Sequence, residues 1–179
     1  IINLAHGQLM MVAMYITFVL SSFFHIDPYL SLLIAMPCLF LLGMFLQKFF
    51  LNPLIKIDSI LPENQVLMTV GIGMVLTEIA RFIFSSDYKS VKTSYSSSAF
   101  FVGGISFNLP MCIAFLFAVA FTGALFWFLL KTDIGRSIRA TAQDRDAATL
   151  MGVNSERITY ITFGLGSALV AAAGCLLIP

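Results

Sequence analysis

Long stretches without a charged residue dominate the pattern of this chain. Residues 28–47, 93–130 and 158–179 contain no Asp, Glu, Lys or Arg. A helix needs about 20 mostly apolar residues to cross the hydrocarbon core of a bilayer, and only helices or closed barrels can cross it. Continuous apolar stretches favour helices, because barrel strands alternate with a period of two. The pattern predicts five membrane-spanning helices, at Leu9–Phe24, Tyr29–Phe50, Gln65–Ser86, Leu109–Leu130 and Ile158–Ile178.

Composition agrees with a bilayer as the solvent. Hydrophobic residues make up 59% of the 179 residues and charged ones 11%, whereas a soluble domain carries about a quarter charged residues. We therefore expect an all-α, polytopic transmembrane helical bundle that forms a single domain over residues 1–179. The chain begins without Met, ends directly after an apolar stretch and shows no signal-peptide pattern. We expect it to be a fragment of a longer membrane protein.

The distribution of Lys and Arg predicts how the spans are oriented. The linkers at about 47–64 and 131–157 carry seven of these residues, and the linkers at 25–28 and 87–108 carry two. Cytoplasmic loops are enriched in Lys and Arg, so the first two linkers are predicted to be cytoplasmic. The Ser- and Gly-rich linker at 87–108 then lies outside, and we expect little regular structure in it. Asp27, just before Pro28, suits a turn or a helix start between the first two spans.

The linker at 131–157 holds about half of all the charged residues in the chain. Asp144 can cap a helix by accepting from the free N–H groups of its first turn. Gly152 suits the left-handed position that follows a helix, and Asn154 or Ser155 can cap the next helix. We predict a short helix between these caps, lying along the inner face of the membrane.

This short helix carries small or apolar residues but is too short to form a core of its own. These residues are Ala147, Ala148, Leu150 and Met151. They can form a contact with another protein, since small residues allow close approach. Equally, the segment can be a solvated loop that rests on lipid headgroups.

The polar segment Asn3–Gln8, which reads NLAHGQ, stands within apolar sequence. Polar residues at membrane depth usually face the bundle interior or a cavity, so Asn3, His6, Gly7 and Gln8 are candidates for the lining of a translocation path or gate. The alternative is a polar cluster that packs helices together, or an interfacial turn. A metal-binding or catalytic role for His6 is not expected, because the one other histidine is separated from it by a span.

Several further features are expected to serve structure. Glu78 and Arg81 are three residues apart on the third span, and we expect them to form a structural or interfacial ion pair. Gly and Ala at helix-packing spacing should bring spans together: Gly71, Gly73, Gly164, Ala168 and Ala172. The cysteines are expected to be buried small hydrophobic residues: Cys38, Cys112 and Cys175.

Other kinds of chemistry find no support in the sequence. The chain has no GxxxxGK[ST] motif for binding ATP phosphates, no nucleophile paired with a base, and no His/Cys spacing typical of a metal site. With a net charge of +1 and no basic stripe, it offers nothing for nucleic acid. Neither a cofactor nor an enzymatic reaction is predicted, and any energy source would be another chain.

Two segments resemble a known family. DAATLMG, at Asp146–Gly152, is similar to the EAA-x-x-x-G motif of ABC-importer membrane subunits, with Asp146 in place of glutamate. The longer stretch from Gly135 to Leu177 and the segment INLAHGQLMMVAMY at Ile2–Tyr15 resemble the branched-chain amino-acid ABC transporter permeases. NPLIKID at Asn52–Asp58 and LMTVGIGMVL at Leu67–Leu76 occupy the expected intermediate positions. The Ile-x-Leu-Pro that often follows the motif glycine in other importer families is missing.

The resemblance implies a permease subunit of an ABC importer, in the bacterial inner membrane, that carries branched-chain or related amino acids. It implies as partners two ATP-binding cassette subunits, a second permease and a solute-binding protein. The segment at about 131–157 would be the coupling loop, with these residues docking on the ATPase: Asp146, Ala147, Ala148, Leu150, Met151 and Gly152. The resemblance further implies a span before INLAHG and others after residue 179 in the full-length protein.

Two other functions remain open from the residues. An ATP-independent channel or secondary transporter for small polar solutes would need ionisable residues at mid-membrane, and the third span offers only Glu78 and Arg81. The other is a membrane enzyme or a purely structural membrane protein. An enzyme would need acids, histidines or cysteines clustered at the interface, and none cluster suitably in the sequence.

Overall fold

The computed structural model describes residues 3–55, 62–85, 91, 99–102 and 105–178. Its elements are α1 (His6–Phe24), α2 (Pro28–Leu46), the π-helix η1 (Gln47–Leu51), α3 (Asn52–Ile55), α4 (Pro62–Phe84), β1 (Ala99–Val102), β2 (Ile105–Asn108), α5 (Leu109–Lys131), α6 (Asp133–Gln143), α7 (Arg145–Leu150) and α8 (Ser155–Leu177). Five helical segments in this part of the chain are long and apolar enough to cross a membrane: α1, α2 with η1, α4, α5 and α8. The predicted helical bundle and its five spans are confirmed.

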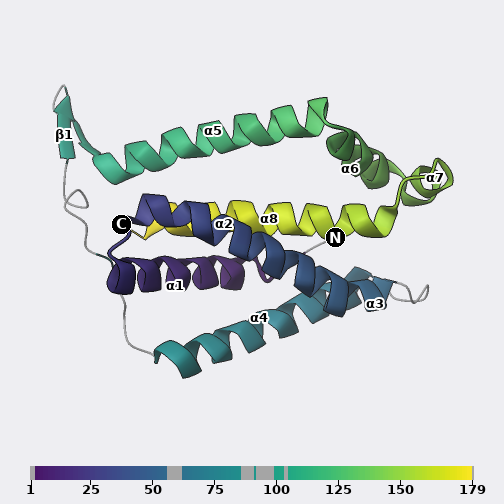
Figure 1. Ribbon diagram of the computed structural model, residues 1–179, viewed down its shortest axis with the longest axis horizontal. Coiled ribbons are helices and arrows are strands. Elements are labelled where there is room, and N and C mark those ends of the chain that lie inside the picture. The colour runs from purple at the N-terminus through teal and green to yellow at the C-terminus, as the bar shows by residue number, and fades with distance from the viewer. Residues whose placement is uncertain (1–2, 56–61, 86–90, 92–98, 103–104, 179) are drawn as a thin grey trace.

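The antiparallel pair α2 and α8 forms the centre of the bundle. Gly43, near the end of α2, meets Ser167 in the middle of α8, and Leu32 and Ala35 near the start of α2 pack with Cys175 near the end of α8. Helix α1 completes this centre through a buried cluster with both helices. Figure 1 shows α5 along one flank of these three helices and α4 along the other.

Glycines allow α2 and α8 to approach closely. A Cβ atom on Gly43 would lie 2.3 Å from Ser167 Oγ and 2.7 Å from Ser167 Cβ, and one on Gly164 would lie 3.0 Å from the carbonyl oxygen of Phe40. Ala168 and Ala172 are buried on the same helix. The packing role predicted for Gly164, Ala168 and Ala172 is therefore confirmed, as small residues drive helix association in bilayers.

Polar groups also join the three central helices. The hydroxyls of Thr17 on α1 and Ser31 on α2 lie 3.2 Å apart, and the Thr17 hydroxyl lies 3.1 Å from the Cys175 thiol on α8. All three side chains are buried. Hydrogen bonds of this kind add specificity to helix packing in membranes, where lipid offers no alternative partner.

Helices α4 and α5 lie at the edges of this centre, and α5 is the less buried of the two. In α5 only Pro110 is buried, and Phe115, Leu116 and Trp127 are exposed. Exposed apolar side chains are expected where a helix faces lipid or another membrane subunit. The Glu78–Arg81 pair on α4 forms as predicted, at 3.0 Å with both side chains exposed.

Several sequence predictions were wrong. The linker at 87–108 contains an antiparallel hairpin, in which Phe100 pairs with Phe107, because aromatic and β-branched residues flank a Gly-Gly pair in the sequence. Gly71 does not pack against another helix, since a Cβ there would meet nothing within 4 Å. Of the cysteines, only Cys175 is buried, whereas Cys38 is exposed and Cys112 is intermediate.

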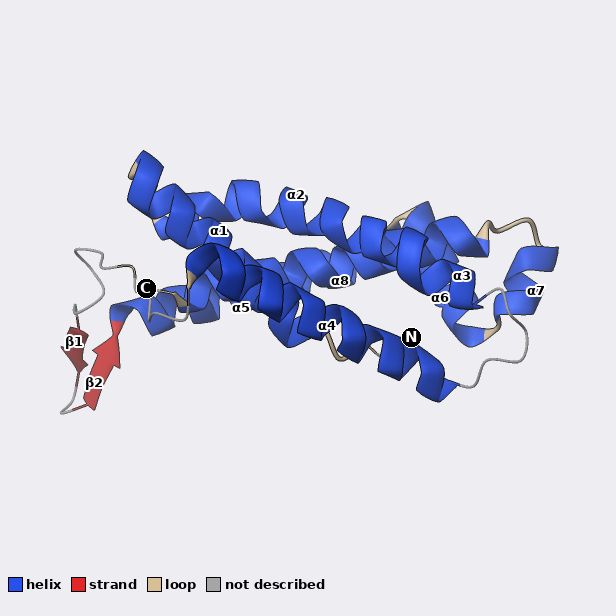
Figure 2. Cartoon of the chain, turned by 90° about the horizontal axis from the view of Figure 1, so that it is seen from below, coloured by secondary structure: helices blue, strands red, loops and turns tan. Residues whose placement is uncertain are grey.

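The two ends of the bundle differ in structure. Figure 2 shows the hairpin at one end and α3, α6 and α7 at the other. The segments predicted to be cytoplasmic from their Lys and Arg content thus share one end, hereafter the α7 end.

The close α2–α8 contact generates a stability prediction. Gly43→Ala should lower the free energy of unfolding by about 1–3 kcal/mol, because the new Cβ overlaps the fixed Cβ of Ser167. Gly71→Ala on α4 is the matched control and should be neutral or stabilising, since alanine favours helix formation. Thermal unfolding of the full-length protein in detergent measures both. Equal effects of the two substitutions would contradict the importance of this contact.

Candidate functional site

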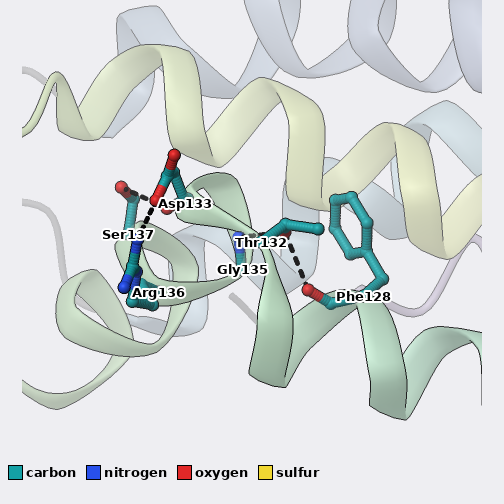
Figure 3. Close-up of polar contacts among 6 residues, drawn as sticks. All are labelled: Phe128, Thr132, Asp133, Gly135, Arg136 and Ser137. Atoms are coloured by element: carbon teal, nitrogen blue, oxygen red, sulfur yellow. Dashed lines mark hydrogen bonds and ion pairs between the residues drawn. The ribbon is translucent and has the colours of Figure 1, made fainter.

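A tight corner joins α5 to α6 at the α7 end. Thr132 caps α6: its Oγ1 accepts from the Gly135 N–H at 3.0 Å and donates to the Phe128 carbonyl at 2.7 Å (Figure 3). Asp133 forms an ion pair with Arg136, and Ser137 Oγ donates to the Asp133 carbonyl at 2.9 Å. Thr132 therefore fixes the corner by hydrogen bonds to both helices, α5 through Phe128 and α6 through Gly135.

Gly135 makes this corner possible. A Cβ at this position would lie 2.5 Å from the carbonyl oxygens of Phe128 and Leu129, which are backbone atoms of α5. Only glycine fits, so the first turn of α6 lies directly against the last turn of α5. The direction in which α6 leaves the membrane-spanning helix is set by this contact.

Helix α7 begins and ends as the sequence predicted. Asp144 Oδ1 accepts from the N–H groups of Asp146 and Ala147, both at 2.9 Å. Gly152 has φ +88°, the left-handed conformation that follows a helix end. Asn154 Oδ1 then accepts from the Arg157 N–H at 3.0 Å and starts α8.

The proposed coupling residues divide into an inner and an outer set. Ala148 is 6% exposed and packs within the chain, whereas Leu150 is 89% exposed and Met151 86% exposed. Asp146 and Ala147 are also exposed. The predicted docking role of Ala148 stays a prediction, and the structure places this side chain against its own chain rather than on the exposed surface of α7. An external contact through α7 would use Leu150 and Met151.

Helix α7 is held to the start of α8. The hydroxyls of Thr149 and Ser155 lie 2.6 Å apart, and the Val153 N–H donates to the Ala148 carbonyl at 3.0 Å. Ser155 is itself buried. These short contacts connect α7 to the start of the membrane-spanning helix α8.

The segment Asn3–Gln8 lies at the mid-depth of two long helices. The His6 Nε2 atom is 3.9 Å from the position of a Cβ on Gly166, and the Gln8 side chain is 3.0 Å from that on Gly73. Both glycines are the central residues of their helices, with eleven helical residues on either side. The polar start of α1 therefore lies beside the middle of α4 and α8 rather than beside an end of either helix.

A cavity of about 560 Å³ opens beside this segment, toward the α7 end. It is bounded by the start of α1, the start of α4, α6 with the first residue of α7, and the first half of α8. The described residues that line it are Asn3, His6, Gln65, Ile138, Thr141, Ala142, Arg145, Ile158, Thr159, Thr162, Phe163 and Gly166.

The structure brings together only part of the predicted path. Asn3 and His6 line the cavity, whereas Gly7 and Gln8 do not. Among the described residues, Asn3 Nδ2 and Gln8 Oε1 are buried without a hydrogen-bond partner. Within the same part of the chain, no three His, Cys, Asp or Glu side chains are grouped as metal ligands.

Most of the cavity lining was missed by sequence reasoning. Helix α6 was not predicted, although Ile134 and Ile138 are four residues apart and alternate with charged residues, as in an amphipathic helix. Thr159 and Thr162 were read only as part of a span. Their three-residue spacing places them on one face of α8, which is the signal that could have found them.

The α5–α6 corner generates a second prediction. Gly135→Ala should displace α6, because its Cβ overlaps backbone atoms that cannot move independently, and should lower the free energy of unfolding by about 1–3 kcal/mol. Limited trypsin digestion should cut faster at Arg136 and Arg139. Gly123→Ala on α5 is the control, since its Cβ would meet nothing within 4 Å. Unchanged cleavage in Gly135→Ala would show that the corner tolerates a side chain.

Comparison with known proteins places the whole chain in one family. The family model described as the branched-chain amino acid transport system / permease component matches residues 1–179. The high-affinity branched-chain amino acid transport system permease protein BraD of Pseudomonas aeruginosa is 26% identical over 188 residues. The probable branched-chain amino acid transport permease protein LivH of Methanocaldococcus jannaschii is 28% identical over 186 residues. Each alignment covers 98% of this chain.

A further relative has a higher sequence identity over a shorter segment. The high-affinity branched-chain amino acid transport system permease protein LivH of Escherichia coli (strain K12) is 43% identical over 54 residues, which is 30% of this chain and 18% of that protein. The chain spans 60% of the length of BraD and 56% of the archaeal LivH. No solved structure gives a significant match.

The family match covers every residue, and the described helices include five that can cross a membrane. The chain is therefore a multi-pass membrane protein, and it belongs to the family of branched-chain amino acid transport system permease components.

Proposed function

We propose that this chain is part of the membrane-spanning permease subunit of an ABC importer. It would translocate branched-chain or related amino acids across the bacterial inner membrane, driven by separate ATPase subunits. The observation that carries the ATPase part of the proposal is α7, which combines an exposed apolar tip, Leu150 and Met151, with a tight connection to α8.

Exposed apolar residues on a short helix outside the spans call for a protein partner. Leu150 and Met151 are exposed, and α7 lies at one end of the bundle (Figure 1). The segments at this end are rich in Lys and Arg, and the positive-inside rule predicts that such segments are cytoplasmic. Interface energy concentrates in a few such residues that insert into a pocket. A groove on a cytoplasmic ATPase would bury them, and ATP-driven closure would move α7 and α8 together.

The partners follow from the same architecture. Two ATPase subunits would dock on the α7 helices of two permeases, which are either homologous or identical. The exposed apolar face of α5 supports contact with lipid or with the second permease. A solute-binding protein would deliver the amino acid at the hairpin end.

One observation favours the alternative of an ATP-independent channel or secondary transporter. His6 is an ionisable side chain at mid-depth, the location expected of a proton-coupling group. The exposed pair Glu78–Arg81 does not line the cavity and lends this alternative nothing. Association with an ATPase separates the two functions.

The first test removes the α7 tip. Leu150→Ala with Met151→Ala should weaken ATPase binding about 10- to 1,000-fold, since truncating each buried hot-spot residue costs more than about 1 kcal/mol. Co-purification of co-expressed ATPase subunits with the full-length permease, and amino-acid uptake, measure the effect. Leu33→Ala with Met74→Ala is the matched control, because both side chains are exposed on spans.

The outcome separates docking from other roles of the loop. Retention of the ATPase by the α7 double variant would contradict docking through this tip. Failure of the unmodified, well-folded protein to retain any ATPase would move the channel or secondary transporter to first place.

A second test addresses the connection between α7 and α8. Gly152→Val should reduce uptake while leaving membrane insertion intact, because a β-branched residue is strained at φ +88°. Gly152→Asn should retain most of the uptake, since asparagine tolerates the left-handed conformation. Quantitative uptake normalised to protein in the membrane measures both. Full uptake by Gly152→Val would show that the geometry of this connection is not required.

A further inference from the structure

We infer that the cavity beside α1 is an inward-facing binding site for the amino acid, in which Arg145 of α7 binds the substrate carboxylate. This inference rests on the proposed function and adds to it a site and a set of binding groups. The described lining contains three kinds of group: an anion-binding arginine, hydrogen-bond acceptors and an apolar surface.

Among the described residues that line the cavity, Arg145 carries a charge, and no Asp or Glu lies beside it there. Among the described residues no carboxylate forms an ion pair with Arg145. Arginine presents donors in a planar fork that matches a carboxylate. An anion that enters the cavity can therefore bind the Arg145 guanidinium. Arg145 is the first residue of α7.

The threonine hydroxyls supply acceptors for an ammonium group. Thr141, Thr159 and Thr162 each donate to the carbonyl of the residue four positions earlier, at 2.9, 2.7 and 2.8 Å. A hydroxyl has one proton and two lone pairs. With the proton used inside the helix, each oxygen can only accept from a ligand.

His6 is arranged in the same way. Its Nδ1 lies 2.9 Å from the Asn3 carbonyl oxygen, which can only accept, so Nδ1 carries the proton. In the neutral ring Nε2 is then an acceptor, and it is on the side of Gly166, in the cavity wall.

The rest of the lining suits an aliphatic side chain. Ile138, Ile158 and Phe163 give an apolar surface, and a volume of about 560 Å³ lies within the range of small-molecule sites. The combination fits a zwitterion with a branched apolar side chain. Because Arg145 opens α7, an amino acid bound here would contact the helix proposed to dock on the ATPase.

Binding measurements with matched ligands and variants test this site. The full-length permease with its ATPase subunits, in nanodiscs and without binding protein, is titrated with radiolabelled L-leucine. L-Leucinamide, which lacks the carboxylate, and 4-methylpentanoate, which lacks the ammonium group, are competitors. The unmodified complex should bind leucine at least about tenfold more tightly than either analogue, because each leaves one set of binding groups unpaired.

Substitution of Arg145 should affect recognition of the carboxylate alone. Arg145→Gln should weaken leucine binding about 10- to 100-fold and leave leucinamide binding nearly unchanged. Arg139→Gln is the control, since Arg139 is exposed on α6 and does not line the cavity. Thr162→Val is a second variant of nearly unchanged shape, and it should weaken leucine but not 4-methylpentanoate.

Each outcome decides the inference. Unchanged leucine affinity in Arg145→Gln would overturn it and would indicate that this side chain binds another anion, such as a lipid phosphate. Absence of leucine binding by the unmodified complex would overturn it as well. Uptake of leucine into proteoliposomes is measured in parallel in the presence of the binding protein. Leucine binding without any uptake would overturn the proposed function rather than the binding site.

Discussion

The close approach of α2 and α8 is the contact on which the other features depend. Gly43, Gly164 and Ser167 bring the two backbones together, and α1 packs into the groove that they form. In a bilayer the hydrophobic effect does not hold helices together, so close packing and hydrogen bonds must do so. The small residues of α8 therefore set the position of the α2–α8 pair. Helix α1 packs against this pair, and α7 is joined to the start of α8.

The two halves of α8 have different neighbours. Its second half is packed against α1 and α2 and contains most of the buried residues. Its first half lines the cavity with Thr159 and Thr162 and is tied to α7 through Ser155. This packed central pair, with the start of α8 joined to α7, is the arrangement on which the proposed coupling to an ATPase depends.

Features that depend on neighbouring residues or on the bilayer could be predicted from the sequence. The five spans were predicted to within a few residues, because a bilayer requires long apolar segments whatever their neighbours. Asp144, Gly152 and Asn154 were placed correctly, because helix caps depend on adjacent residues. The hairpin at β1 and β2 was missed, since Ser and Gly dominate the linker around it. The cavity was not predictable, because its walls come from segments as distant as Asn3 and Phe163, and only tertiary packing brings them together.

Ala148 is buried whereas Leu150 and Met151 are exposed, so two different selective pressures act within four consecutive residues. A larger residue at Ala148 would act on folding, whatever partner is present. Changes at the two exposed positions would alter only what the helix touches. With the docking proposed above, exchange of this pair alone would let a chimeric transporter accept an unrelated energy-supplying subunit, and drift in this pair during evolution would isolate paralogous systems from one another without loss of stability.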